Sequence, residues 1–342
     1  MCAREASHIV MPIVPGGPRV LRGPRAADQE LLDKELWLLR PSGGGWPEES
    51  WERGWHVMTI MDQPAPHPTI TQRLLDLAPA RGEKPALVGG AALTQGQRLS
   101  YGEFARMVQA AAAGLAWRGV RPGDAVGVYV PDAPSYALAV HAIRAVGAIP
   151  SPICRTATVT RMGTQLTECC ARMLITGPPL VPAALAAVER SWVRQIISFG
   201  DDAGTVPFGS LLSRGSQQPT RCGARDLALL PYESEPDGGL RPVPLTHEDI
   251  AEELRVLAAA TPMTGQDVVI AAAPAGEGRA YGALVDLALL EGAMIVAPSG
   301  PHVADAAGIA DAARAHGGTA AIVHPGTPVP QGVSLRMVTA PP

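Results

Sequence analysis

The chain has 342 residues, a formal net charge of −4, and a composition that is 46% hydrophobic and 18% charged. That length accommodates two or three globular units, and the weak negative charge argues against nucleic acid or an anionic membrane surface as a partner. Lysine occurs only at Lys34 and Lys84, which excludes chemistry that needs a lysine side chain from residues 85–342.

The cellular compartment follows from the cysteines and from the apolar patterning. No run of about 18 apolar residues predicts a membrane span, and the N-terminal residues lack the long apolar segment of a signal peptide. The five cysteines contain no CxxC pair, and neither they nor the histidines have the spacing of a metal site. We therefore expect a cytoplasmic protein without a metal centre.

Residues 1–57 differ in composition from the rest of the chain. They hold four of the six tryptophans and the glycine run Gly43–Gly45, and one short helix is predicted from Asp28 to Arg40. We interpret this stretch as a poorly ordered extension, with a docking arm as the alternative. The candidate translation starts are Met1, Met58 and Met61.

From about Thr69 onward, apolar runs alternate with helical patterns. Ser100 and Glu103 have the spacing of a capping box, which predicts a helix that begins there and ends near Gly119. Strands are predicted at residues 125–130, 149–153, 172–176, 194–199, 227–232, 267–273, 293–297 and 319–324. Helices are predicted at residues 133–146, 160–170, 280–290 and 303–316, and directly after Thr246.

This alternation predicts an α/β fold built from βα units that form largely parallel sheets. We expect three parts: the extension at 1–57, a first α/β subdomain at 58–240, and a second α/β subdomain at 241–342.

A series of short segments carries a family resemblance. In chain order they are Lys84–Val88, Leu99–Phe104, Gly119–Asp124, Ala145–Pro150, Ala171–Thr176 and Leu245–His247. The series resembles the N-terminal large domain of the adenylate-forming superfamily, the acyl-CoA synthetases and 4-coumarate–CoA ligase-like enzymes, over roughly residues 67–340. The resemblance implies that domain's fold, incomplete at the C-terminus. It also implies an AMP-forming, ATP-dependent carboxylate–CoA ligase activity with ATP, Mg and CoA, if the activity survives.

The superfamily has a phosphate-binding loop, such as Tyr-Ser-Ser-Gly-Thr-Thr-Gly-Leu-Pro-Lys-Gly, before its Leu-Thr-His motif. Glycines there turn backbone N–H groups toward phosphate, hydroxyls donate to phosphate oxygens, and the lysine neutralises charge. Aligned on that motif, Glu233 and Glu235 stand at a hydroxyl and a glycine position of the loop. Pro236 and Asp237 replace the two threonines, and Arg241 stands at the lysine.

These replacements predict a loop that does not bind ATP productively. One pair of like charges 4 Å apart costs roughly 4 kcal/mol at an effective dielectric near 20, which is about a thousandfold in affinity. Proline also lacks a backbone donor. The candidate cofactor-binding residues that remain in this relic site are Ser234, Gly238, Arg241 and Thr246. No catalytic residue and no metal ligand is assigned.

We expect a catalytically inactive relative of the acyl-CoA synthetases, without a cofactor, that acts by binding an acyl ligand, a carrier protein or a homologous ligase. The resemblance stops before the superfamily's adenine-binding segment and its catalytic lysine. A sheet that stops mid-domain has an edge strand that needs cover, which also favours self-association. The acyl or aryl substrate stays open, as does whether the C-terminus is natural or results from a frameshift.

Three alternatives remain. The first alternative is a half-enzyme whose missing part is supplied in trans by another polypeptide. The second alternative is the product of a decaying gene. The third alternative is an NADP-binding reductase-like module, because Gly276, Gly278 and Gly282 follow a predicted strand with spacing similar to a dinucleotide-binding turn. Glu277 opposes an anion at that turn.

Overall fold

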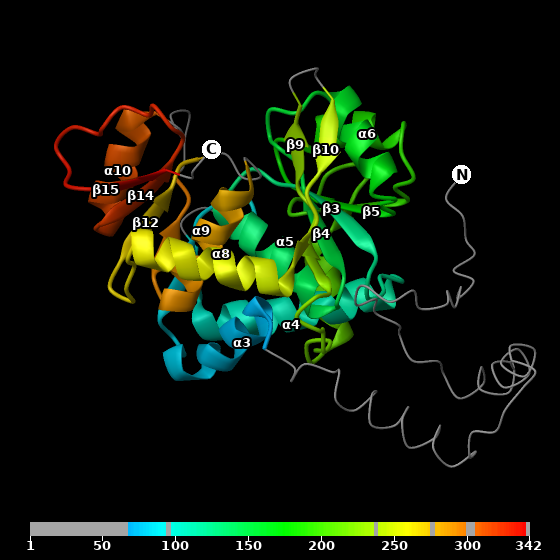
Figure 1. Cartoon of the computed structure of the whole chain (residues 1–342), viewed down its shortest axis with the longest axis horizontal. Coiled ribbons are helices and arrows are strands. Elements are labelled where there is room, and N and C mark those ends of the chain that lie inside the picture. Colours follow the sequence, from blue (N-terminus) through cyan, green and yellow to red (C-terminus); the bar gives the residue numbers. More distant parts are fainter. Residues whose placement is uncertain (1–67, 94–96, 236–238, 274–277, 299–304, 340–342) are drawn as a thin grey trace, which may run out of the picture. The chain divides into compact units, whose positions relative to one another are not determined.

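The computed structural model describes residues 68–339, except 94–96, 236–238, 274–277 and 299–304. These residues belong to the second of two compact units, Pro64–Pro342. The helix expected from Asp28 to Arg40 and the candidate translation starts lie outside the described residues. The described part is an α/β fold in which helices pack on mostly parallel sheets (Figure 1), as the sequence predicts.

A five-stranded sheet is parallel throughout and has the strand order β4-β3-β5-β6-β7. Its strands are β3 (Ala125–Tyr129), β4 (Ile149–Pro152), β5 (Met173–Thr176), β6 (Gln195–Ser198) and β7 (Val206–Pro207). The helices between and around them are α4 (Tyr101–Trp117), α5 (Ala133–Ala145), α6 (Val159–Glu168), α7 (Val181–Val188) and a 3₁₀ helix, Phe208–Arg214. Every residue of β4 and β5 is buried, which is typical of a parallel sheet covered on both faces.

A six-stranded sheet has the order β15-β14-β12-β13-β1-β2 and is parallel except for the pair β1–β2. Its strands are β1 (Pro85–Val88), β2 (Arg98–Ser100), β12 (Val268–Ala271), β13 (Met294–Val296), β14 (Ala320–Val323) and β15 (Arg336–Thr339). Its helices are α3 (Ile70–Arg81), α8 (His247–Ala260), α9 (Gly278–Glu291) and α10 (Ala306–His316). The sheet takes strands from both sides of residue 240, so strand pairing does not follow the subdomain boundary expected there.

Two small antiparallel pairs complete the described strands. They are β8 (Leu227–Leu229) with β11 (Leu245–Thr246), and β9 (Tyr232–Ser234) with β10 (Leu240–Pro242). The single strand expected at 227–232 is therefore wrong. The backbone N–H of Leu230 donates to Pro150 at 2.9 Å, and Pro231 has no N–H to donate, so the ladder is interrupted between β8 and β9.

The capping box expected at Ser100 is confirmed. The Ser100 hydroxyl accepts from the Glu103 backbone N–H at 3.2 Å, and the Glu103 carboxylate accepts from the Ser100 backbone N–H at 2.8 Å. These bonds satisfy two donors that the first turn of α4 would otherwise leave unpaired.

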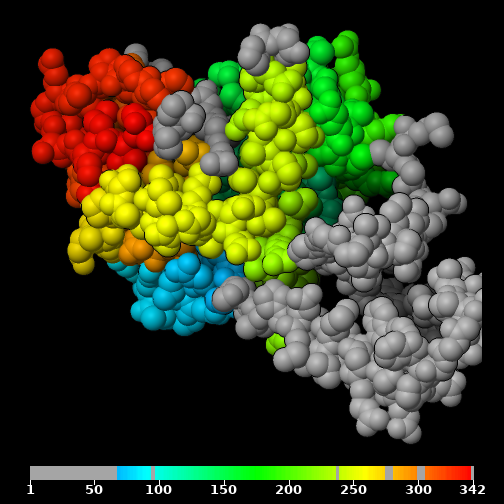
Figure 2. Space-filling model, in the orientation of Figure 1, coloured from blue at the N-terminus to red at the C-terminus, as the bar shows by residue number. Residues whose placement is uncertain are grey.

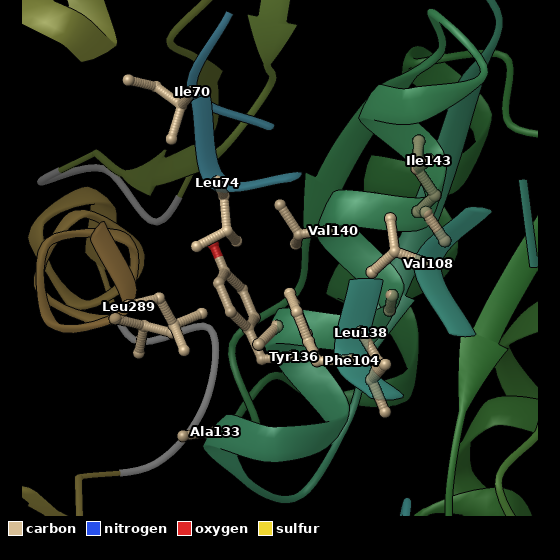
Figure 3. Packing of buried hydrophobic residues seen from close by; sticks show 14 of the residues in the cluster. Ile70, Leu74, Phe104, Val108, Ala133, Tyr136, Leu138, Val140, Ile143 and Leu289 are labelled. Carbon is tan, nitrogen blue, oxygen red and sulfur yellow. The ribbon is translucent and has the colours of Figure 1, made fainter. Parts of the chain in front are cut away.

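Helix α5 is the most deeply buried helix among those described, because all of its residues are buried. Figure 3 shows Tyr136 and Val140 of α5 facing Leu74 of α3, with Phe104 and Val108 of α4 beside them and Leu289 of α9 across from them. One hydrophobic cluster contains these residues together with residues of both larger sheets, such as Val126 and Ile295. The helix is therefore the centre of the shared core.

A polar cluster interrupts this apolar core. Asp286 of α9 lies 2.7 Å from Nη1 of Arg144, and its other carboxylate oxygen lies 3.2 Å from Nε2 of His141. His141 Nδ1 is 2.9 Å from the hydroxyl of Thr71 on α3, and Arg144 Nε donates to the carbonyl of Ala228 at 3.0 Å. The cluster thus links α3, α5, α9 and β8.

The charge of Asp286 is stabilised by its neighbours. Burial by itself raises the pKa of this carboxyl, but Arg144 and the contact with His141 outweigh burial and lower the pKa of Asp286 to about 2. Asp286 is therefore ionised at neutral pH although it is 2% exposed.

We predict that Asp286→Ala lowers the free energy of unfolding by about 3–5 kcal/mol, because it leaves the buried Arg144 guanidinium without its counter-charge. The matched control is Asp311→Ala, which breaks the exposed pair with Arg314 on α10 and should cost about 0–1 kcal/mol. Urea unfolding at pH 7 measures both. Equal losses in the two variants would contradict the role of the buried cluster.

Candidate functional site

The predicted phosphate loop forms a β-hairpin, in which β9 and β10 pair antiparallel. Ser234 lies opposite Leu240 and Glu233 lies opposite Arg241. The backbone N–H of Glu235 donates to the carbonyl of Gly239 at 2.9 Å. Ser234 and Arg241 are both exposed on this hairpin, while Gly238 lies outside the described residues.

The arginine of the hairpin is paired with the hairpin's own carboxylates. The Arg241 guanidinium bonds to Glu233, and its Nε lies 3.8 Å from Oε1 of Glu235. All three side chains are about half exposed, so each contact stabilises the hairpin by no more than about 1 kcal/mol. The pairing neutralises the hairpin's own arginine and leaves one of the two carboxylates in excess. The Arg161 guanidinium of α6 also reaches the hairpin, where it donates to the carbonyl of Gly239 at 3.4 Å.

Thr246 belongs to a different local structure. It is the N-cap of α8 and forms a capping box with Asp249. Its hydroxyl donates to the Asp249 carboxylate at 2.7 Å and accepts from the Asp249 backbone N–H at 3.1 Å. The first turn of this helix is acidic, with Glu248 and Asp249. The hydroxyl therefore caps a helix, and Thr246 lies on a strand that pairs with β8 rather than with the hairpin.

His247, the first residue of α8, is buried and neutral at physiological pH. Burial, and then the positive charge of Arg144, lower the pKa of His247 to about 4, although Asp226 acts in the opposite direction. Its Nδ1 has no hydrogen-bond partner among the described residues, so nothing there compensates a proton on this nitrogen.

The glycine-rich turn before α9 is only partly described. Gly276 and Glu277 lie outside the described residues, and α9 begins at Gly278. In the first turn of α9, Tyr281 packs edge-to-face on Tyr136 of α5, with ring centroids 5.8 Å apart. Gly282 approaches the Tyr136 hydroxyl so closely that a Cβ has no room, so this glycine has a packing role.

The sequence analysis missed one buried polar cluster and one half-buried carboxylate. One is the cluster of His141, Arg144 and Asp286. The other is Asp132, which caps α5 and accepts from the backbone N–H groups of Ala91 at 2.7 Å and Ser135 at 2.9 Å. For the cluster, the available signal was a charged or imidazole side chain inside an otherwise apolar helix, as in α5 and α9. For Asp132, the signal was an aspartate directly before a predicted helix, the usual place of a capping residue.

Comparison with known proteins decides the family. The sequence model described as "AMP-binding enzyme" matches residues 76–327, which is most of the chain. The chain belongs to the AMP-binding enzyme family. The adenylate-forming resemblance and the expected α/β large-domain fold are both confirmed.

Curated relatives and solved structures agree with this family. The chain is 27% identical over 202 residues to a feruloyl-CoA synthase of an Amycolatopsis species, covering 59% of this chain and 39% of that protein. It is 28% identical over 217 residues to 4-coumarate–CoA ligase-like 9 of Oryza sativa subsp. japonica, covering 60% and 38%. A long-chain-fatty-acid–CoA ligase from Archaeoglobus fulgidus superposes with a TM-score of 0.67 at 22% identity, covering 76% and 52%. The chain thus spans about half or less of the length of these three proteins.

Two further findings concern the described residues only. No helix among them is long and apolar enough to cross a membrane. Nor do any three histidine, cysteine, aspartate or glutamate residues among them come together in a way that could hold a metal ion.

We predict that stability falls as the pH drops from about 6.5 to about 4, because His247 binds a proton more readily in the unfolded chain than in the folded one. The contribution of His247 is fully present above pH 6.5, and up to about 3 kcal/mol of it is lost near pH 4. Urea unfolding of the wild type and of His247→Gln at several pH values measures this, and the variant should show the shallower decline.

The control for this pH series is His324→Gln, which alters an exposed histidine and should follow the wild type. A His247→Gln profile parallel to that of the wild type would show that His247 does not titrate in this range.

Proposed function

We propose that this member of the AMP-binding enzyme family is catalytically inactive and binds no ATP through its β9–β10 hairpin. It acts by binding an acyl ligand, a carrier protein or a homologous ligase. The observation that carries the proposal is the pairing of Arg241, the residue at the superfamily's lysine position, with Glu233 and Glu235.

The charge of the hairpin supports this proposal. Residues 232–242 contain three carboxylates (Glu233, Glu235 and Asp237) against the single cation Arg241. An incoming triphosphate has to break the arginine pairing and then approach the released carboxylates. One such like-charge contact reduces affinity by about a thousandfold at an effective dielectric near 20.

The neighbouring groups do not compensate for this repulsion. The Thr246 hydroxyl is committed to the cap of α8, so presenting it to a phosphate costs the helix about 1 kcal/mol. Lys84, the single lysine among the described residues, donates its Nζ proton to the carbonyl of Gly265. Arg161 of α6 brings a second cation to the hairpin, where its guanidinium donates to the carbonyl of Gly239 at 3.4 Å. The three carboxylates of residues 232–242 still outnumber the two arginines, Arg161 and Arg241.

Isothermal titration with Mg–ATP tests the proposal directly. We expect no binding by the wild type at about 1 mM ATP, and no carboxylate-dependent ATP–pyrophosphate exchange above background. Ferulate and 4-coumarate are suitable acids, because the relatives' names include them. The variant Glu233→Ser/Glu235→Gly/Arg241→Lys should gain affinity by about tenfold or more.

The matched control is Glu248→Ser/Glu252→Ser, which removes two carboxylates from α8 instead of from the hairpin and should stay without ATP binding. Measurable exchange by the wild type would overturn the proposal of inactivity. An equal gain in the control would show that the charge of the whole chain, rather than the hairpin, opposes ATP.

A further inference from the structure

Two tryptophans and five arginines gather where the strands of the five-stranded sheet begin. We call this surface the basic aromatic edge, and its residues are Trp117, Arg118, Arg121, Arg172, Trp192, Arg194 and Arg214. Arg172 and Arg194 directly precede β5 and β6, and the backbone N–H of Arg194 donates to the carbonyl of Arg172 at 2.8 Å. Since β3, β5 and β6 are parallel neighbours, their first residues share one edge of the sheet.

Helix α4 and the 3₁₀ helix Phe208–Arg214 end at this same edge. Gly114 of α4 lies against Leu211 of the 3₁₀ helix with no room for a Cβ, which holds the two helices together. Trp117 and Arg118 end α4, and Arg214 ends the 3₁₀ helix.

The cations of the edge are held in place without losing their charge. The Arg214 guanidinium lies over the Trp117 ring, 3.6 Å from its centroid. Arg118 donates to Oε1 of Gln195 and to the hydroxyl of Ser210, both at 3.2 Å. These partners are neutral, and a guanidinium has five N–H donors, so donors remain for a ligand. Because these side chains are already held in place, they lose less conformational entropy when a partner binds.

The five arginines of the edge outnumber its carboxylates and, within the described part of the chain, form no ion pair with one. Among the described residues, no carboxylate lies within 4.0 Å of the guanidinium nitrogens of Arg118, Arg121, Arg172, Arg194 or Arg214. The carboxylate of Asp124, which directly precedes β3, accepts instead from the backbone N–H of Arg121 at 2.8 Å. Other arginines do pair with a carboxylate, and they include Arg241, Arg255, Arg314 and Arg336. Because the whole chain has a net charge of −4, the unpaired positive charge at the edge is a local feature.

The apolar side chains of the edge are unusually exposed. Trp117 is 60% exposed and Trp192 is 49% exposed. Trp192 precedes Gln195, the residue that holds Arg118, by three positions. Tryptophan and arginine are the residue types that most often dominate the binding energy of protein interfaces.

We propose that the basic aromatic edge docks an acidic protein segment. Its carboxylates bond to Arg118, Arg194 and Arg214, and one of its apolar side chains packs on the indole of Trp117. A long nucleic acid fits less well, because the excess negative charge elsewhere on the chain repels an extended polyanion. None of these residues belongs to the β9–β10 hairpin, so the inference does not rest on the proposed loss of ATP binding.

Fluorescence anisotropy with the full chain tests the proposal. The probe is a labelled helical peptide of about 20 residues, with glutamates on one face and leucines on the other. We expect saturable binding that weakens between about 50 mM and about 300 mM NaCl. Trp117→Ala and the double variant Arg118→Glu/Arg214→Glu should each weaken binding by about tenfold or more.

The matched control is Arg255→Glu/Arg314→Glu, which makes the same charge change on α8 and α10 and should bind the peptide like the wild type. Circular dichroism verifies the fold of each variant. If the double variant unfolds, Trp117→Ala and Trp192→Ala decide the question, since both change exposed side chains.

Four results would overturn the proposal. The peptide does not bind, or the control variant weakens its binding as much as the edge variants do. A single-stranded oligothymidylate binds more tightly than the peptide and loses affinity in the same variants, which assigns the edge to nucleic acid. Sedimentation shows self-association that the edge variants abolish, which assigns the edge to a second copy of the chain.

Discussion

The buried carboxylate of Asp286 is the constraint to which the described core is adapted. An ion in a low-dielectric interior is tolerated only with a counter-charge and hydrogen bonds, and here Arg144 and His141 supply these contacts from α5. Both residues lie on α5, which is buried on all sides. The contacts of Arg144 and His141 with Asp286 therefore fix how α9 is placed against α5. The surrounding apolar contacts of Figure 3, between Tyr136, Leu74 and Leu289, tolerate small displacements more readily than this charge cluster does.

The hairpin shows the opposite use of charge. Glu233, Glu235 and Arg241 are about half exposed, so their pairing contributes little to stability. Its consequence is chemical, because the Arg241 guanidinium is already paired with the carboxylate of Glu233, which lies opposite it on the neighbouring strand. Figure 2 shows this segment, coloured yellow-green in the sequence scale, at the surface between the green and yellow parts of the chain. The same residue type at the basic aromatic edge, held by an indole and by neutral oxygens, keeps its full charge.

Most regular elements could be predicted from the sequence because their signals are local. Continuous apolar runs give β3, β5 and β14, and the capping spacing of Ser100 and Glu103 gives the start of α4. Helix α7 was missed because the positions outside its buried face are also apolar, for example the exposed Pro182 and the half-buried Leu185. These residues hide the helical period of the buried face. At the candidate site, the sequence shows which carboxylates and which arginine the hairpin contains, but the pairing partners of Arg241 and the capping role of Thr246 required coordinates.

The sequence by itself determined the α/β class, the family resemblance and the excess of carboxylates over cations at residues 232–242. Only the tertiary structure decided that β1 and β2 join β12–β15 in one sheet, across more than 150 residues of chain. It also decided that Thr71, His141, Arg144 and Asp286 meet in one cluster, and that arginines from four separate segments share the basic aromatic edge. Local sequence patterns predict whether a residue is buried. They do not predict which residue becomes its neighbour, because that depends on how elements far apart in the sequence pack together.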